Sequence, residues 1–95
     1  MASVTKDIGS ADDWTDGLAV KGSFDLSISG VFEGVVTVQR SFDGGVSWAD
    51  VDSFSAPIET FGQQPAYSLY RVGIAAGDYV SGVATVALIE GDLSD

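Results

Sequence analysis

The chain contains no cysteine and no histidine among its 95 residues. Without cysteine, no disulfide can close the fold, and cysteine usage indicates nothing about the redox compartment. Without histidine, the chain lacks the commonest metal ligand and the side chain used most often as a general base near neutral pH. These two absences argue against metal chemistry and against a nucleophile activated by a neighbouring imidazole.

Positive charge is also scarce, since 4 Lys and Arg stand against 14 Asp and Glu and give a net charge of −10. Affinity for nucleic acid comes largely from cations that meet phosphates, and an anionic membrane surface repels a chain of this charge. We therefore expect neither a nucleic-acid partner nor a membrane partner. A neutral or basic protein surface suits the chain better.

Long apolar runs and cofactor motifs are missing as well. The longest apolar stretch, VATVALI, is too short to cross a bilayer as a helix, and the N-terminal residues lack the apolar run of a signal peptide. No glycine-rich nucleotide-binding motif is present. We expect a soluble protein made in the cytoplasm, with no enzymatic activity, no catalytic residues, no cofactor and no metal.

The residues that are present favour β-structure. In SFDLSIS, Phe24, Leu26 and Ile28 alternate with polar residues, as in a half-buried strand. GVVTVQRSF predicts a second strand and SWADVDSF its return strand; APIETF, YSLYRVGI and YVSGVATVALI follow, with GQQPA as a loop. Pro57 is expected at a strand start or an edge, and Gly82 at a bulge or bend.

Six or seven short strands, separated by Gly and Asp turns, predict an all-β fold. The expected architecture is an antiparallel β-sandwich, Ig-like or jelly-roll-like, with a small barrel as the alternative. A chain of 95 residues forms one domain. Within it we expect an acidic N-terminal arm or edge segment at 1–17, the sandwich at 18–90 and an acidic tail at 91–95.

The stretch SFDGGVSW resembles the Asp-box hairpin of sialidases and other carbohydrate-active propellers, where the motif repeats once in each blade. Here it occurs once. Asp side chains accept amide hydrogen bonds within turns, glycine supplies positive φ, and a Trp ring can cover the hairpin. We therefore predict a structural hairpin rather than a sugar site, with the residues Ser41, Asp43, Gly44, Gly45 and Trp48.

Two groups of carboxylates are candidate functional sites. Asp50 and Asp52 lie two apart on a predicted strand and should share one face, where they could serve a glycosidase or bind Ca²⁺. Asp12, Asp13 and Asp16 could also bind Ca²⁺, although no EF-hand spacing is present. A solvated surface is the simpler interpretation of both groups.

Some residues indicate contact with a partner. VFEGVVTV and GVATVALI carry apolar residues on both faces, which indicates that another surface covers the outside of the sheet, unless small apolar side chains are merely tolerated there. Arg40 and Arg71 are expected to pair with Asp or Glu, and Tyr70 is expected in the core. The candidate interface residues are Trp14, Tyr67, Tyr79 and Arg71.

Two longer stretches, GVVTVQRSFDGGVSWADVDSF (34–54) and YSLYRVGIAAGDYVSGVATVAL (67–88), resemble a group of small β-sandwich virion proteins of tailed bacteriophages. The resemblance implies a capsid decoration (cement) protein, or a tail or fibre component, located in the virion. Its partners would be the major capsid protein or another virion protein, and copies of itself, with a trimer favoured. A carbohydrate-binding or adhesion module of a tail or fibre is the alternative.

Overall fold

The computed structural model describes residues 2–90, except for the side chains of residues 2, 21 and 63–67. Within this part the chain forms strands and no helix. The strands are β1 (Ala2–Ile8), β2 (Asp13–Trp14), β3 (Leu18–Ser29), β4 (Phe32–Gly34), β5 (Val36–Ser41), β6 (Ala49–Phe54), β7 (Ile58–Ile74), β8 (Tyr79–Gly82) and β9 (Ala84–Glu90). It follows that no helix in residues 2–90 is long and apolar enough to cross a membrane.

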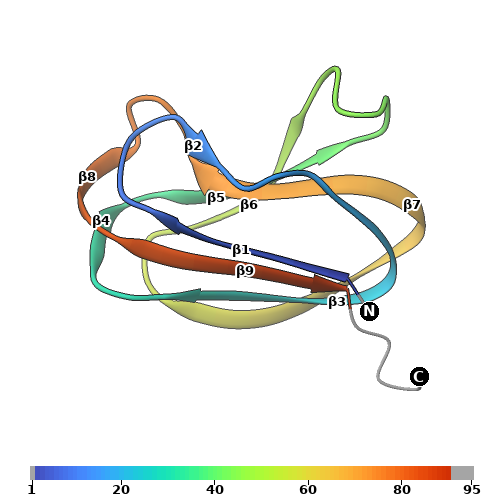
Figure 1. Ribbon diagram of the computed structural model, residues 1–95, viewed down its shortest axis with the longest axis horizontal. Helices are drawn as coiled ribbons and strands as arrows, with labels where there is room; N and C mark the ends of the chain where they lie inside the picture. Colours follow the sequence, from blue (N-terminus) through green and yellow to red (C-terminus); the bar gives the residue numbers. More distant parts are fainter. Residues whose placement is uncertain (1, 91–95) are drawn as a thin grey trace.

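Most strands belong to one antiparallel sheet with the order β1-β9-β3-β7-β5-β6 (Figure 1). β2 adds to β7 beside this path, and β4 and β8 form a separate two-stranded ribbon. Within the described residues, the terminal strands β1 and β6 do not pair with each other. The sheet is therefore open, and the fold is a small β-sandwich rather than the closed barrel considered as the alternative.

The two long strands, β3 and β7, connect the two halves of the sandwich. β7 pairs with β3 along Ile58–Gln64 and again at 68–70, and its last part also pairs with β5. The register shifts between Val20 and Gly22, which lets the long pair bend. A single core cluster includes residues of β1, β3, β5, β7 and β9, so the halves face each other. Phe24 and Tyr70 meet there with ring centroids 4.9 Å apart, and the core position expected for Tyr70 is confirmed.

The alternation expected in SFDLSIS is confirmed, because Phe24, Leu26 and Ile28 are buried and Asp25 is exposed. Two other strand predictions were wrong. The backbone of GQQPA continues β7 instead of forming a loop, so APIETF and YSLYRVGI belong to one strand, which begins directly after Pro57. YVSGVATVALI divides into β8 and β9 just after Gly82, whose φ of 83° gives the bend that was expected there.

Within residues 2–17, β1 and β2 pair with the same sheet as the rest of the chain. β1 is an edge strand paired with β9, and Ile8 at its end is fully buried in the core. β2 pairs with β7 through Trp14 and Gly73. The acidic tail expected at 91–95 lies outside the described residues.

Candidate functional site

The stretch SFDGGVSW forms the connection between β5 and β6, and its polar side chains hold its backbone. Ser41 Oγ accepts hydrogen bonds from the amides of Asp43 and Gly45 (3.3 and 2.9 Å) and donates to Asp43 Oδ1 (2.7 Å). Asp43 in turn accepts from the amide and the hydroxyl of Ser47 (2.9 and 2.5 Å). These bonds hold the pKa of Asp43 at about 2, below its ordinary 3.8, chiefly through Ser47.

The structural role expected for these residues agrees with this geometry, but the connection is longer than a tight hairpin. It runs over residues 42–48, between the end of β5 and the start of β6. Gly44 and Gly45 have φ values of 74° and 96°, which only glycine adopts at little cost. The Trp48 ring lies close to Gly45, since a Cβ atom there would be 3.7 Å from Cζ2.

Arg71 lies between two indole rings. Its Cζ atom is 4.4 Å from the ring centroid of Trp14 and 4.4 Å from that of Trp48. Its Nε donates a 2.8 Å hydrogen bond to Gln39 Oε1, while Gln39 Nε2 donates to Asp50 Oδ1 at 2.8 Å. Burial lowers the pKa of Arg71, although Asp12 opposes that effect. We call Trp14, Arg71 and Trp48 the Trp–Arg–Trp stack.

The ion pairs expected for the arginines are not formed among the described residues. Arg40 instead lies over the Phe42 ring at 4.5 Å, and Arg71 stacks as described. The ion pair of the described part joins Lys6 Nζ to Asp13 Oδ1 at 2.7 Å. A guanidinium loses little by facing an aromatic ring, because it is weakly hydrated and the ring face is negative.

The docking of β2 was not foreseen from the sequence. The Thr15 amide donates to the Val72 carbonyl (2.9 Å), and the Val72 amide donates to Thr15 Oγ1 (3.1 Å), at a site where Thr15 is 5% exposed. A Cβ atom at Gly73 would lie 2.7 Å from Trp14 Cα and closer still to the Asp13 carbonyl oxygen. Glycine at position 73 is thus required by the close approach of β2, which positions Trp14 over Arg71. The sequence gives only a weak signal, the glycine within YRVGI.

The four candidate interface residues differ in position. Trp14 and Arg71 are half-buried in the stack, and Tyr79 is half-buried with its hydroxyl donating to the Gly82 carbonyl (2.9 Å). Tyr67 belongs to β7, but its side chain lies outside the described residues. The structure therefore brings together two of the four residues, and it adds Trp48, which was expected to cover the hairpin.

The carboxylates of β6 do not share a face. Val38 pairs with Asp52 and its neighbour Gln39 pairs with Asp50, so Val51 is the extra residue of a bulge. Directly paired residues face the same side of a sheet, and Val38 and Gln39 face opposite sides. Asp50 and Asp52 therefore also face opposite sides, which corrects the expectation from their spacing. In the described residues, no group of three or more acidic side chains is arranged to hold a metal ion.

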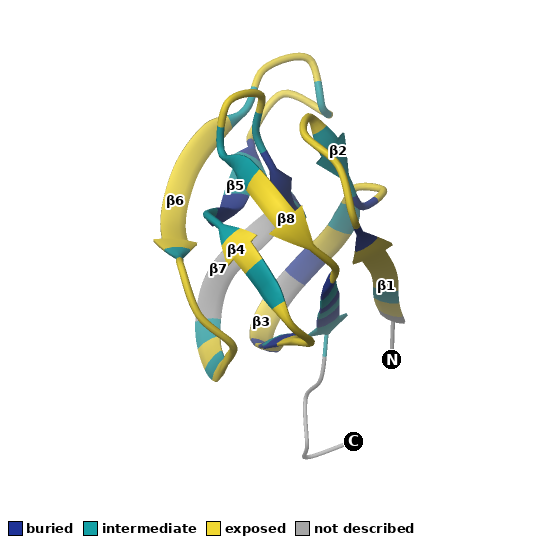
Figure 2. Ribbon diagram, turned by 90° about the vertical axis from the view of Figure 1, so that its left-hand side faces the viewer, coloured by how far each residue is buried: buried dark blue, intermediate teal, exposed yellow. Residues whose placement is uncertain are grey.

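Large apolar side chains are exposed at two ends of the molecule. On and beside the β4–β8 ribbon, Val31, Val80 and Val83 are 90%, 66% and 46% exposed, and the Val83 amide donates to the Val31 carbonyl at 3.0 Å. Phe42 and Val46, on the connection after β5, are 71% and 85% exposed. In Figure 2, most of β6 and parts of β4 and β8 are coloured as exposed. We call Val31, Val80 and Val83 the ribbon patch.

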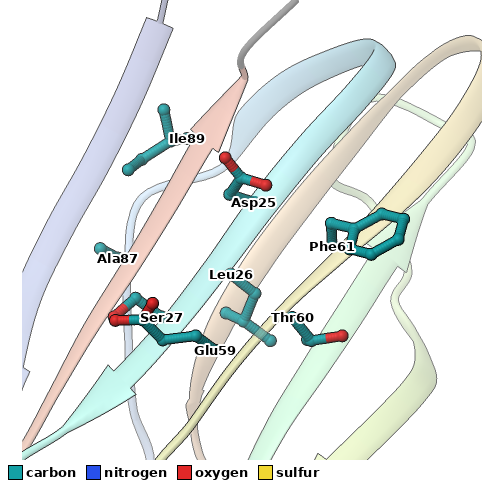
Figure 3. A pocket seen from close by; sticks show the side chains of 8 residues that line it. All are labelled: Asp25, Leu26, Ser27, Glu59, Thr60, Phe61, Ala87 and Ile89. Atoms are coloured by element: carbon teal, nitrogen blue, oxygen red, sulfur yellow. The ribbon is translucent and has the colours of Figure 1, made fainter. Parts of the chain in front are cut away.

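A shallow groove of about 530 Å³ crosses the outer side of β9, β3 and β7 (Figure 3). Asp25 and Ser27 of β3 lie in its middle. Ala87 and Ile89 of β9 lie along one side. Glu59 and Phe61 of β7 lie along the other. We call this the outer groove.

No protein-family model and no curated protein matches the chain. Among solved structures, the crystal structure of Fe(II) HppE is similar with a TM-score of 0.48 and 12% sequence identity, over 92% of this chain and 42% of that one. This chain thus spans less than half the length of that structure. A likeness at this score carries no argument about function.

Proposed function

We propose that the chain is a non-enzymatic structural protein of a tailed-phage virion that decorates the capsid and stabilises it by protein contacts. The ribbon patch is the observation that carries this proposal, because three valines on and beside the β4–β8 ribbon are exposed at 90%, 66% and 46%, and two of them, Val31 and Val83, are joined by a backbone hydrogen bond. Several large apolar side chains exposed on one small element favour protein contact more than single scattered ones do. The resemblance of residues 34–54 and 67–88 to small virion proteins supports the proposal that this contact is made within a virion.

Self-association is part of the proposal, with a trimer favoured. The ribbon patch lies at one end of the sandwich, where a symmetric contact between copies would cover Val31, Val80 and Val83. The acidic surface of the same molecule, with net charge −10, suits the major capsid protein or another virion protein that offers neutral or basic surface.

The test needs purified protein and phage heads that lack it. We expect the protein to run as an oligomer in size-exclusion chromatography with light scattering, to sediment with the heads at saturable stoichiometry, and to raise the temperature at which they rupture. Val31→Ser combined with Val80→Ser should reduce oligomer formation. Phe42→Ser is a matched control, because it removes an apolar residue that is 71% exposed at a different place. A monomer that leaves heads unbound would overturn the proposal.

A carbohydrate-binding module of a tail or fibre is the second candidate, and the Trp–Arg–Trp stack is the observation that favours it. Trp14 and Trp48 remain half-exposed. Polar side chains lie around these two rings, namely Asp12, Asp50 and Gln39. Aromatic rings beside polar side chains can pack against sugars, but here one face of each ring is already taken by Arg71. A glycan array that shows no binding above background, or binding unaffected by Trp48→Leu, would dismiss this candidate.

A further inference from the structure

We propose that the outer groove is a docking surface for a protein segment that presents an arginine or lysine side chain. The proposal rests on the proposed function in one respect, namely that the partner is another protein. It goes further because it names the chemistry of the partner and the face of the sandwich that receives it.

Strand register places the groove residues together. β3 pairs with β9 through Asp25 and Ile89, and with β7 through Asp25 and Phe61. Two residues further along β3, Ser27 pairs with Ala87 of β9 and with Glu59 of β7. Because directly paired residues face the same side, two rows cross the three strands on the outer face. These rows are Ile89–Asp25–Phe61 and Ala87–Ser27–Glu59.

The sizes of these side chains give the groove its shape. Ser27 in the middle and Ala87 along one side are small, whereas Phe61 along the other side is large and 76% exposed. The exposed phenyl ring on one side of Asp25 and Ile89 on the other give apolar surface along which the methylene groups of a long cationic side chain can pack. The face of the ring also attracts a cation directly.

The charges of the groove complement such a side chain. Asp25 and Glu59 are exposed and lie diagonally across adjacent strands. In the described part of the chain, neither carboxylate forms a hydrogen bond or an ion pair. A guanidinium has five donors in a planar fork and can bind two carboxylates at once, and an ammonium can bridge them. Both charges of the groove would then be paired.

Other occupants fit less well. A calcium ion takes six to eight oxygen ligands, more than the two carboxylates of this groove supply. A second copy of the chain is disfavoured, because each copy carries a net charge of −10 and has only four cationic residues. Lys6 pairs with Asp13, and Arg40 and Arg71 stack on aromatic rings of their own chain. A basic segment of a different protein remains the best match.

The binding test uses the full chain, labelled with ¹⁵N, and a capped hexapeptide that contains two arginines and two leucines. The same peptide with citrulline in place of arginine is the control, since citrulline keeps the shape and removes the charge. We expect the arginine peptide to shift amide resonances of residues 25–27, 59–61 and 87–89, and the citrulline peptide to bind at least about tenfold more weakly. Shifts spread evenly over the acidic surface, or no binding of the arginine peptide, would overturn the proposal.

Substitutions separate the groove from the general charge of the molecule. Asp25→Asn with Glu59→Gln should weaken binding of the arginine peptide by about tenfold, as should Phe61→Ser through loss of the ring. Asp50→Asn with Asp52→Asn removes the same two charges from the exposed strand β6 and should change the affinity less than twofold. Equal effects of the two double variants would overturn the proposal, as would groove shifts caused by a neutral oligosaccharide.

The two proposals can fail separately. If the arginine peptide binds in the groove but the protein ignores phage heads, the proposed virion function fails and the docking surface stands. If heads are bound equally well by wild type and by Asp25→Asn with Glu59→Gln, and the peptide does not bind, the docking surface fails and the virion function stands.

Discussion

At Ser41 and Asp43, two short side chains provide the hydrogen bonds of a loop that has no strand partner of its own. Ser41 is 2% exposed and accepts from two amides of the loop, while Asp43 accepts from the amide and the hydroxyl of Ser47. Buried or loop amides that stay unpaired are costly, so such side chains decide whether a seven-residue connection, 42–48, has one conformation.

The pH dependence of Asp43 follows from these bonds. Its pKa is about 2 in the folded chain against an ordinary 3.8, so its contribution to stability is complete above about pH 4 and is lost as the pH falls towards 2. The difference in unfolding free energy between wild type and Asp43→Asn, measured by urea denaturation, should therefore shrink from pH 5 to pH 2. A carboxyl ¹³C titration of Asp43 with its midpoint near 4 would contradict this.

A second prediction at the scale of one residue concerns Thr15. Its hydroxyl accepts from the Val72 amide in a buried place, and Thr15→Val has nearly the same volume but leaves that amide without a partner. We expect a loss of about 1–3 kcal/mol in unfolding free energy. Thr15→Ser, which keeps the hydroxyl, should cost clearly less. Equal losses in the two variants would show that the methyl group matters more than the hydrogen bond.

Among the elements, β2 has only two residues, Asp13 and Trp14, yet it contacts two other parts of the fold. It pairs with the end of β7, and through Trp14 it covers one side of Arg71. Trp48 reaches the other side from the β5–β6 connection. The Trp–Arg–Trp stack thus joins segments that are distant in sequence.

Gly73→Ala tests this element. The added methyl group would overlap Asp13 and Trp14, so β2 should separate from β7 and Trp14 should leave the stack. We expect a red-shifted tryptophan fluorescence spectrum and a destabilisation of about 1–3 kcal/mol. Gly9→Ala is the control, since a Cβ atom there finds its nearest neighbour, a Val83 side-chain carbon, at 3.4 Å. An unchanged spectrum for Gly73→Ala would contradict the role of β2.

For the whole molecule, charge is the dominant surface property. Fourteen acidic and four basic residues give −10 on 95 residues, and the described part holds one ion pair, between Lys6 and Asp13. Like charges at this density repel one another and oppose the compact state. The same repulsion favours a basic partner over close packing of acidic faces.

Salt should therefore stabilise the isolated chain. Raising NaCl from about 0.01 M to about 0.5 M shortens the screening length several-fold, so repulsion among carboxylates weakens. We expect the unfolding free energy to rise by about 1 kcal/mol and the melting temperature to rise by about 4–8 °C. The measurement is thermal unfolding by circular dichroism at constant pH. A melting temperature that falls with NaCl would contradict the dominance of repulsion.

Several features of this protein followed from residues that are close together in the sequence. The alternation in SFDLSIS indicated the buried face of β3, and the Ser, Asp and Gly residues of SFDGGVSW indicated a structured turn, because both depend on local geometry. The composition predicted an all-β fold with an acidic surface.

Tertiary structure alone decided which distant segments meet. Only the pairing of β1 with β9 and of β2 with β7 shows that residues 2–17 belong to the sandwich. Only the bulge at Val51 separates Asp50 from Asp52, and only the register of three strands assembles the outer groove. The physical reason is that alternation fixes which residues share a face of one strand, whereas strand order and register depend on hydrogen bonds between segments far apart in the chain.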